Sequence, residues 1–161
     1  MTGAAPIRHS VTVGRTLDQA FQLFTDRMGT WWPLDQYSRA VNEFGAEGVT
    51  ATELEFQARM GGSILEHLSN GTVLPWGEVI GWDPPDRVVM AWRPHSLPEA
   101  PTELEVTFTA RGEGTLVEIE HRGWERLSPE FRATLYPIYV RGWVTTLERF
   151  AEVADQGADE A

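Results

Sequence analysis

Cysteine and lysine are both absent from this 161-residue sequence. Without cysteine the chain can form no disulfide, no thiolate nucleophile and no zinc-thiolate site, so its stability must come from packing. All 13 basic residues are arginine, and a lysine Schiff base is therefore excluded. The sequence therefore excludes two common kinds of covalent catalysis, by a cysteine thiolate and by a lysine Schiff base.

Positive charge is scarce as well. The formal net charge is -11 and the isoelectric point is near 4.7, so the chain would repel a phosphate backbone or an anionic membrane surface. No apolar run approaches the ~20 residues that cross a bilayer, and the N-terminus lacks the apolar segment of a signal peptide. We expect a cytoplasmic protein with no nucleic-acid and no membrane partner.

Sequence motifs for metal, phosphate and hydrolase chemistry are missing too. The sequence contains no HExxH, no aspartate-rich loop, no glycine-rich phosphate loop and no G-x-S-x-G elbow. We therefore expect no metal and no cofactor. These absences favour a binding protein over an enzyme without deciding between the two.

The patterns that are present predict one domain, over residues 6–155, with flexible tails at 1–5 and 156–161. Alternation of apolar and polar residues over 7–13 predicts a strand with one buried face. Thr16 and Gln19 form a capping-box pattern, and the apolar spacing that follows predicts an amphipathic helix ending at Gly29. Residues 34–48 allow either a further helical turn or a loop.

From Val49 onwards the pattern changes to short alternating segments separated by turn residues, as in an antiparallel meander. The six strands are expected near 50–57, 62–68, 76–83, 87–93, 102–110 and 115–122. In the last two, glutamates at 103, 105, 118 and 120 share one face. We interpret that face as solvated and acidic, not as a metal cluster.

A long amphipathic helix is expected at the C-terminus. Ser128, Pro129 and Glu130 open a helical turn, but Pro137 should interrupt or restart it because proline lacks an amide donor. The main helix should then run from about 137 to 154. Its apolar stripe comprises Val140, Trp143, Val144, Leu147, Phe150, Ala151 and Ala154.

Several short motifs, spread over nearly the whole chain, resemble those of one family. They are Phe24-Thr25 before Trp31-Trp32-Pro33, residues 61–66 (GGSILE), Trp76-Gly77-Glu78-Val79, Asp83-Pro84-Pro85 leading to Trp92, residues 114–117 (GTLV) leading to His121, and Gly142-Trp143. The sequence thus resembles the SRPBCC or START-like superfamily, in the branch of activator of heat-shock protein 90 ATPase homologues. The resemblance implies an α+β helix-grip (Bet v 1-like) fold of order β-α-α-β6-α, with a curved antiparallel sheet of about seven strands around the C-terminal helix and a cavity between them.

Tryptophan is abundant, with seven in the sequence. An indole can simply fill the core, or it can line a pocket, where it offers apolar area and one hydrogen-bond donor. If they line a pocket, its walls would hold a small hydrophobic or aromatic ligand. The residues expected there are Trp32, Glu66, Trp76, Met90, Trp92, Phe108, His121, Trp143 and Leu147.

Two of these residues are also candidate catalytic groups. His121 has the parity of buried residues on its strand, so it is either a hydrogen-bonded core histidine or an acid/base group. Glu66 has inward parity as well, unless a bulge at Gly61-Gly62 turns it to solvent.

The resemblance and these residues allow three functions and leave open whether the protein is an enzyme. The first is a small-molecule binding protein with a tryptophan-lined cavity. The second is a polyketide cyclase/aromatase-like enzyme that uses Glu66 and His121 as acid and base. The third is a co-chaperone-like interaction module acting through its outer face, and a homodimer is possible in each case.

Overall fold

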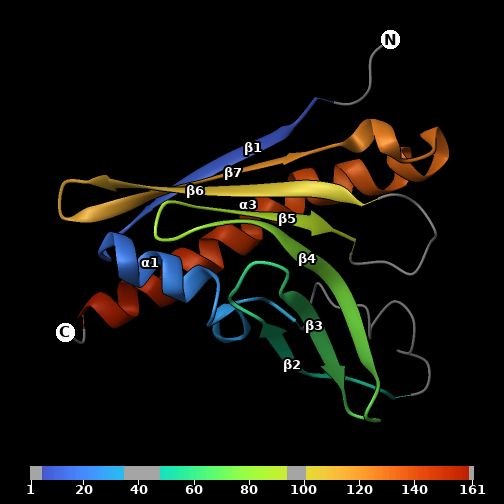
Figure 1. Cartoon of the computed structure of the whole chain (residues 1–161), viewed down its shortest axis with the longest axis horizontal. Coiled ribbons are helices and arrows are strands. Elements are labelled where there is room, and N and C mark those ends of the chain that lie inside the picture. Colours follow the sequence, from blue (N-terminus) through green and yellow to red (C-terminus); the bar gives the residue numbers. More distant parts are fainter. Residues whose placement is uncertain (1–4, 35–47, 94–100, 160–161) are drawn as a thin grey trace.

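The computed structural model describes residues 5–34, 48–93 and 101–159, and it shows a curled sheet with a long helix lying along it (Figure 1). The elements in chain order are β1 (Ile7–Val13), α1 (Leu17–Phe24), the 3₁₀ turn η1 (Met28–Thr30), β2 (Ala51–Phe56), β3 (Ser63–Leu68), β4 (Val73–Asp83), β5 (Arg87–Trp92), β6 (Thr102–Arg111), β7 (Gly114–Arg122), the 3₁₀ turn η3 (Trp124–Arg126) and α3 (Pro129–Asp159). The seven strands and the terminal helix confirm the predicted helix-grip fold. Of the segment 34–48, for which the sequence allows a further helical turn or a loop, residues 35–47 lie outside the described residues.

The sheet is antiparallel throughout, in the order β1-β7-β6-β5-β4-β3-β2. Strands β2 to β7 form a meander in which each pairs with the next along the chain. The N-terminal strand β1 instead pairs with β7, so the first and the last strand of the chain lie side by side in the sheet. This order puts β3 and β7 in different halves of the sheet, which matters for the candidate site.

Curvature of the sheet is concentrated around β4. Register shifts occur between Ile64 and Leu65 on β3 and between Val79 and Gly81 on β4, and such bulges bend and twist strands. Gly77 lies on the same strand, where any Cβ would collide with the carbonyl of Ala91. Figure 1 shows β4 sweeping from one half of the sheet to the other.

The first helix begins as predicted but ends earlier. The Thr16 side chain accepts from the Gln19 amide, and the Gln19 side chain accepts from the Thr16 amide, which confirms the capping box. However, α1 ends at Phe24, not at Gly29. The hydroxyl of Thr25 donates to the Phe21 carbonyl at 2.7 Å, and the backbone of Thr25 leaves the helical region. The chain then continues as η1.

The predicted interruption of the C-terminal helix at Pro137 is wrong. Helix α3 runs without a break from Pro129 through Pro137 to Asp159. Pro137 is exposed, so its ring needs no room in the core, and only its own amide bond is lost from the ladder. Packing of the flanking turns, with Tyr136 and Tyr139 against the core, offsets that loss. The apolar stripe is also narrower than predicted, because Val144 is 43% exposed.

Helix α3 is fixed to the N-terminal segment along its length. The Gly14 amide donates to Asp155 Oδ1 at 2.9 Å, and Arg15 Nε donates to the Ala154 carbonyl at 2.9 Å. One ring nitrogen of His9 lies 3.3 Å from the Val140 carbonyl. The helix is therefore an integral part of the core. None of the helices in the described ranges has the length and apolar character required to cross a membrane.

Candidate functional site

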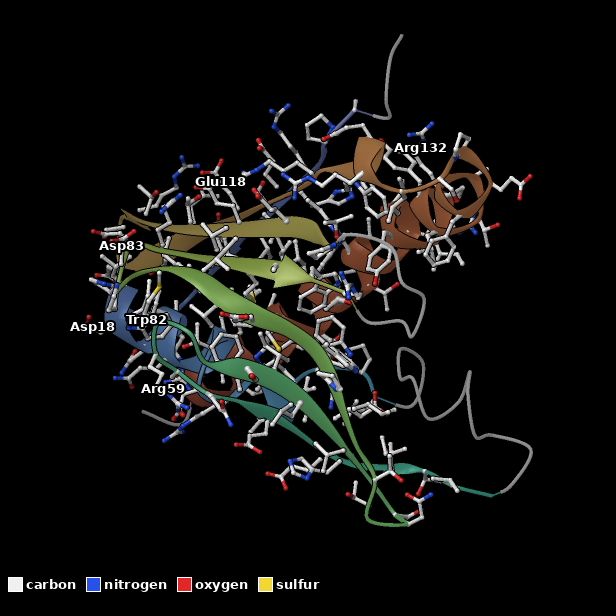
Figure 2. The ribbon with its side chains drawn as sticks, turned by 45° about the vertical axis from the view of Figure 1, so that its right-hand side comes forward. Asp18, Arg59, Trp82, Asp83, Glu118 and Arg132 are labelled. Atoms are coloured by element: carbon white, nitrogen blue, oxygen red, sulfur yellow. The ribbon has the colours of Figure 1, made fainter. Side chains whose placement is uncertain are left out.

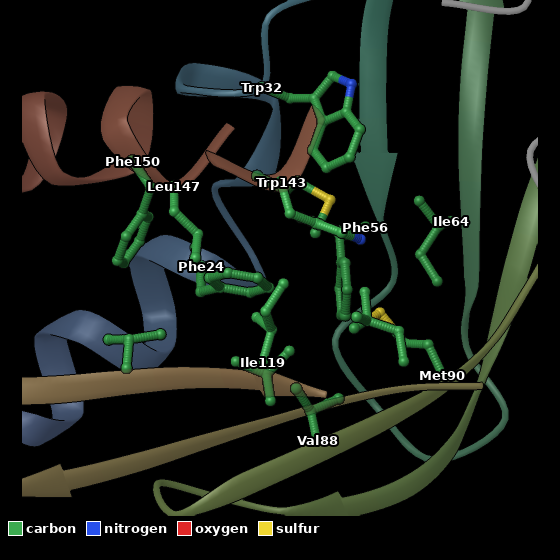
Figure 3. Close-up of a cluster of buried hydrophobic side chains, with 14 of the residues drawn as sticks. Phe24, Trp32, Phe56, Ile64, Val88, Met90, Ile119, Trp143, Leu147 and Phe150 are labelled. Atoms are coloured by element: carbon green, nitrogen blue, oxygen red, sulfur yellow. The ribbon is translucent and has the colours of Figure 1, made fainter. Parts of the chain in front are cut away.

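All nine predicted ligand-binding residues are buried, with side chains at most 9% exposed. Four of them form one group, defined here as the indole cluster: Trp32, Trp76, Trp92 and Trp143. Phe108 is placed elsewhere, because its ring contacts Phe21 and Phe24 of α1. Figure 3 shows Trp32 and Trp143 together, with Met90 on the sheet and Leu147 farther along α3.

The indole cluster joins three parts of the fold. Trp76 comes from β4, Trp92 from β5 and Trp143 from α3, whereas Trp32 follows the short η1 turn. Ring centroids of Trp32 lie 5.1 Å from those of Trp76, 5.8 Å from Trp92 and 5.9 Å from Trp143. The Trp32 indole therefore lies among the other three and fills the space between them.

Glu66 lies at one side of this cluster. Its neighbours on β3, Ile64 and Leu68, are buried, and Glu66 itself is 0% exposed, so the inward parity is confirmed. Trp76 Nε1 donates to Glu66 Oε1 at 2.9 Å. The bulge at this end of β3 does not turn the carboxylate to solvent. An acidic side chain is thereby held in an interior made mostly of apolar groups.

His121 lies at the other side, and both of its ring nitrogens are occupied. Trp143 Nε1 donates to Nδ1 at 3.0 Å, and Nε2 lies 2.7 Å from the hydroxyl of Thr102. That hydroxyl donates its own proton to the Trp92 carbonyl at 3.0 Å, so the proton between Nε2 and Thr102 belongs to His121. Burial lowers the pKa of His121 to about 3, which keeps the ring neutral near pH 7. In this arrangement His121 orients Trp143.

The two catalytic candidates are separated by the indole cluster. Glu66 is on β3 and His121 on β7, four strand spacings apart, or roughly 19 Å along the sheet at ~4.8 Å per strand. Each accepts a hydrogen bond from a different indole. The geometry brings both to one aromatic region but does not pair them as acid and base on one reacting atom.

Tyr139 is a polar residue of this region that the sequence analysis missed. Trp92 Nε1 donates to its hydroxyl at 3.3 Å, and its ring centroid lies 4.9 Å from His121 and 6.3 Å from Trp143. Burial raises the pKa of Tyr139, so it remains a neutral phenol. Its position four residues before Trp143 was an available signal, because i and i+4 share a helix face.

The outer face of β6 and β7 carries paired charges. Arg122 contacts Glu103, Glu105 and Glu120 at 2.6 to 3.1 Å, and these contacts raise the pKa of the guanidinium. Burial alone would raise the pKa of Glu105, but hydrogen bonds from Arg122 and Arg87 hold it below its usual value. Three of the four predicted acidic residues are therefore paired, and Glu118 is exposed. The described residues contain no cluster suited to a metal ion.

Among the described residues, two groups line hollows in the surface away from the indole cluster. One, of about 390 Å³, lies over β1, β6 and β7 and includes Arg8 and Glu118. The other, of about 380 Å³, lies between α1 and the turn after β4, where Asp18 and Trp82 line it. Figure 2 shows Asp18 and Trp82 at the same end of the molecule, and Glu118 on the outer face.

Solved structures share this fold. The solution structure of the Aha1 dimer from Colwellia psychrerythraea has a TM-score of 0.66 at 15% identity, over 94% of this chain and 97% of that one. A protein from Bacillus halodurans has a TM-score of 0.62 at 17% identity, over 96% of this chain and 100% of that one.

One solved structure is more similar in sequence. It is an anthrahydroquino-gamma-pyrone synthase complexed with a ligand designated SUM, with a TM-score of 0.62 at 28% identity, over 95% of this chain and 99% of that one. No curated protein sequence gives a match. Residues 15–155 match the family described as Activator of Hsp90 ATPase homolog 1-like protein. This chain, with its curled seven-stranded sheet and terminal helix, therefore belongs to that SRPBCC-type family.

Proposed function

We propose that this protein binds a small hydrophobic or aromatic molecule between the curled sheet and α3, against the indole cluster. The predicted residues other than Phe108 would line or support that site. The observation that carries the proposal is the indole cluster itself, in which a buried carboxylate and a buried imidazole each accept from an indole. A core built for stability alone gains nothing from an inward glutamate, because burying a carboxylate costs free energy.

The position of Trp32 suggests how a ligand would enter. Its indole belongs to neither the sheet nor α3, yet it packs between Trp76, Trp92 and Trp143. Moving it aside would leave a space the size of a bicyclic aromatic ring without changing any strand or the helix. The ligand would then replace the Trp32 ring in contact with the other three indoles.

The comparison at 28% identity supports the same class of ligand. That relative is named for a fused aromatic pyrone product and was solved with a ligand bound. The two chains match over almost their full lengths. An aromatic ligand is therefore the class that both the indole cluster and this relative favour.

A test follows from competition between ligand and Trp32. In Trp32→Phe a smaller ring must be displaced, so affinity for naphthalene should rise, by up to about tenfold, because less buried apolar area is lost. Trp82→Phe is the matched control, since Trp82 packs against Phe21 of α1 and lines a surface hollow away from the cluster. Equilibrium dialysis measures the naphthalene affinity of both variants and of the wild type. Equal affinities in wild type, Trp32→Phe and Trp82→Phe would contradict the proposed place of binding.

A cyclase-like enzyme is the second candidate, and the relative named as a synthase favours it. In that reading Glu66 and His121 act on one extended substrate from opposite ends. His121 would have to release Trp143 or Thr102 before it could exchange a proton. Loss of turnover with retained binding in His121→Gln would select this reading over simple binding.

A further inference from the structure

Tyr139 has a hydroxyl proton for which the described residues supply no acceptor. Its oxygen receives the Trp92 indole proton at 3.3 Å, so its own proton must point in another direction. The ring is fixed by contacts with His121 at 4.9 Å and Trp124 at 5.5 Å. The donor is thus held in place beside Trp92 and Trp143, two members of the indole cluster.

Neighbouring donors are already used within the fold. The indole of Trp76 donates to Glu66, that of Trp143 to His121 Nδ1, and that of Trp124 to the His121 carbonyl. The imidazole proton goes to Thr102, whose hydroxyl donates to the Trp92 carbonyl. A ligand next to these groups would find their protons engaged.

We infer that the Tyr139 hydroxyl donates the hydrogen bond that orients the ligand, and that the ligand is an aromatic compound carrying a carbonyl or similar acceptor oxygen. This inference rests on the proposed function. In this inference Tyr139 determines which ligand is bound. Glu66 and His121 hold the indoles of Trp76 and Trp143 in position through their hydrogen bonds. The phenol stays protonated because burial raises its pKa, so the donor is available throughout the neutral range.

The class of ligand follows from the chemistry of a neutral donor. A phenol O–H favours a carbonyl oxygen, which accepts two hydrogen bonds, and gives nothing to a plain hydrocarbon. A ring ketone, quinone or pyrone presents such an oxygen at the edge of a flat apolar body. The indole faces would contact that body while Tyr139 selects its oxygenated edge.

The test compares two bicyclic probes of similar size, chromone with a ring carbonyl and naphthalene without one. Tyr139→Phe should weaken chromone binding by roughly two- to tenfold, the usual worth of one neutral hydrogen bond, and leave naphthalene binding unchanged. Tyr136→Phe is the matched control, because the Tyr136 hydroxyl donates to the Ala5 carbonyl at an exposed position. Equilibrium dialysis gives all six affinities, and thermal melting checks that each variant is folded.

The outcomes separate the two proposals. Unchanged chromone affinity in Tyr139→Phe, with both probes bound by the wild type, overturns the role of Tyr139 and leaves the binding site in place. Equal losses for chromone and naphthalene also overturn it, because Tyr139 would then serve packing alone. If the wild-type protein binds neither probe, the proposed function fails and this inference fails with it.

Discussion

At the scale of single residues, His121 illustrates how burial determines chemistry. A histidine free in solution titrates near neutrality, but here it is 0% exposed and lies between Trp143 and Thr102. Removing the charged form from water disfavours protonation, so its pKa falls to about 3. The ring is a fixed hydrogen-bond partner in the neutral state.

His121 should therefore make stability depend on pH. Between pH 6.5 and 3 the unfolded chain binds a proton at this position and the folded chain does not, so the free energy of unfolding falls as the pH is lowered. From pH 6.5 to 5 the expected loss is about 2 kcal/mol. Urea denaturation of wild type and His121→Gln at several pH values measures it. The same pH slope in both proteins would contradict this account.

The sequence predicts which side chains of a strand point inward, but it does not predict which side chains from other elements they contact. The alternation along β3 and β7 predicted an inward orientation for Glu66 and His121, because a strand places every second side chain on one face. The partners could not be predicted, since Trp76, Trp143 and Thr102 come from other elements. Tyr139 was missed because the apolar pattern of α3 favoured Val140, and a tyrosine counts as polar or apolar according to its surroundings.

At the scale of elements, α3 shows a local rule overridden by its context. Proline inside a helix removes one backbone hydrogen bond, and from sequence alone Pro137 reads as a break. The helix continues because Trp143, Leu147 and Phe150 bury one side of it and the preceding turns also reach the core. Burial of a large apolar side chain is worth roughly 1.5 to 3 kcal/mol, and several such side chains exceed the cost of one proline.

Pro137→Ala should therefore stabilise the protein. The substitution restores an amide donor at an exposed position of the helix interior, and the gain should be about 1 to 2 kcal/mol after allowance for the freer unfolded chain. Pro129→Ala is the control, because Pro129 occupies the first helical position, where a missing donor costs nothing. Thermal melting compares the stability of Pro137→Ala and Pro129→Ala with that of the wild type. Destabilisation by Pro137→Ala would mean that the proline shapes α3 in a way that packing requires.

At the scale of the whole molecule, the sequence pattern predicts the fold but does not predict which side chains meet in the interior. The order of strands and helices was predictable because alternation, turn residues and an amphipathic stripe recur along the chain. Which indoles meet was not predictable, since Trp32, Trp76, Trp92 and Trp143 are far apart in the sequence and come from β4, β5, α3 and the segment after η1. The net charge of -11 likewise gave no hint that arginines pair with most of the outer glutamates.

The central claim, that ligands bind at the indole cluster, is tested most directly by the seven tryptophan side-chain N–H signals in a ¹⁵N-¹H spectrum. Titration with chromone should shift the signals of Trp32, Trp76, Trp92 and Trp143 and leave that of Trp82, which lines a surface hollow, in place. Single tryptophan-to-phenylalanine variants assign the signals. Shifts confined to Trp82, or no shift in any of the four, would contradict the account.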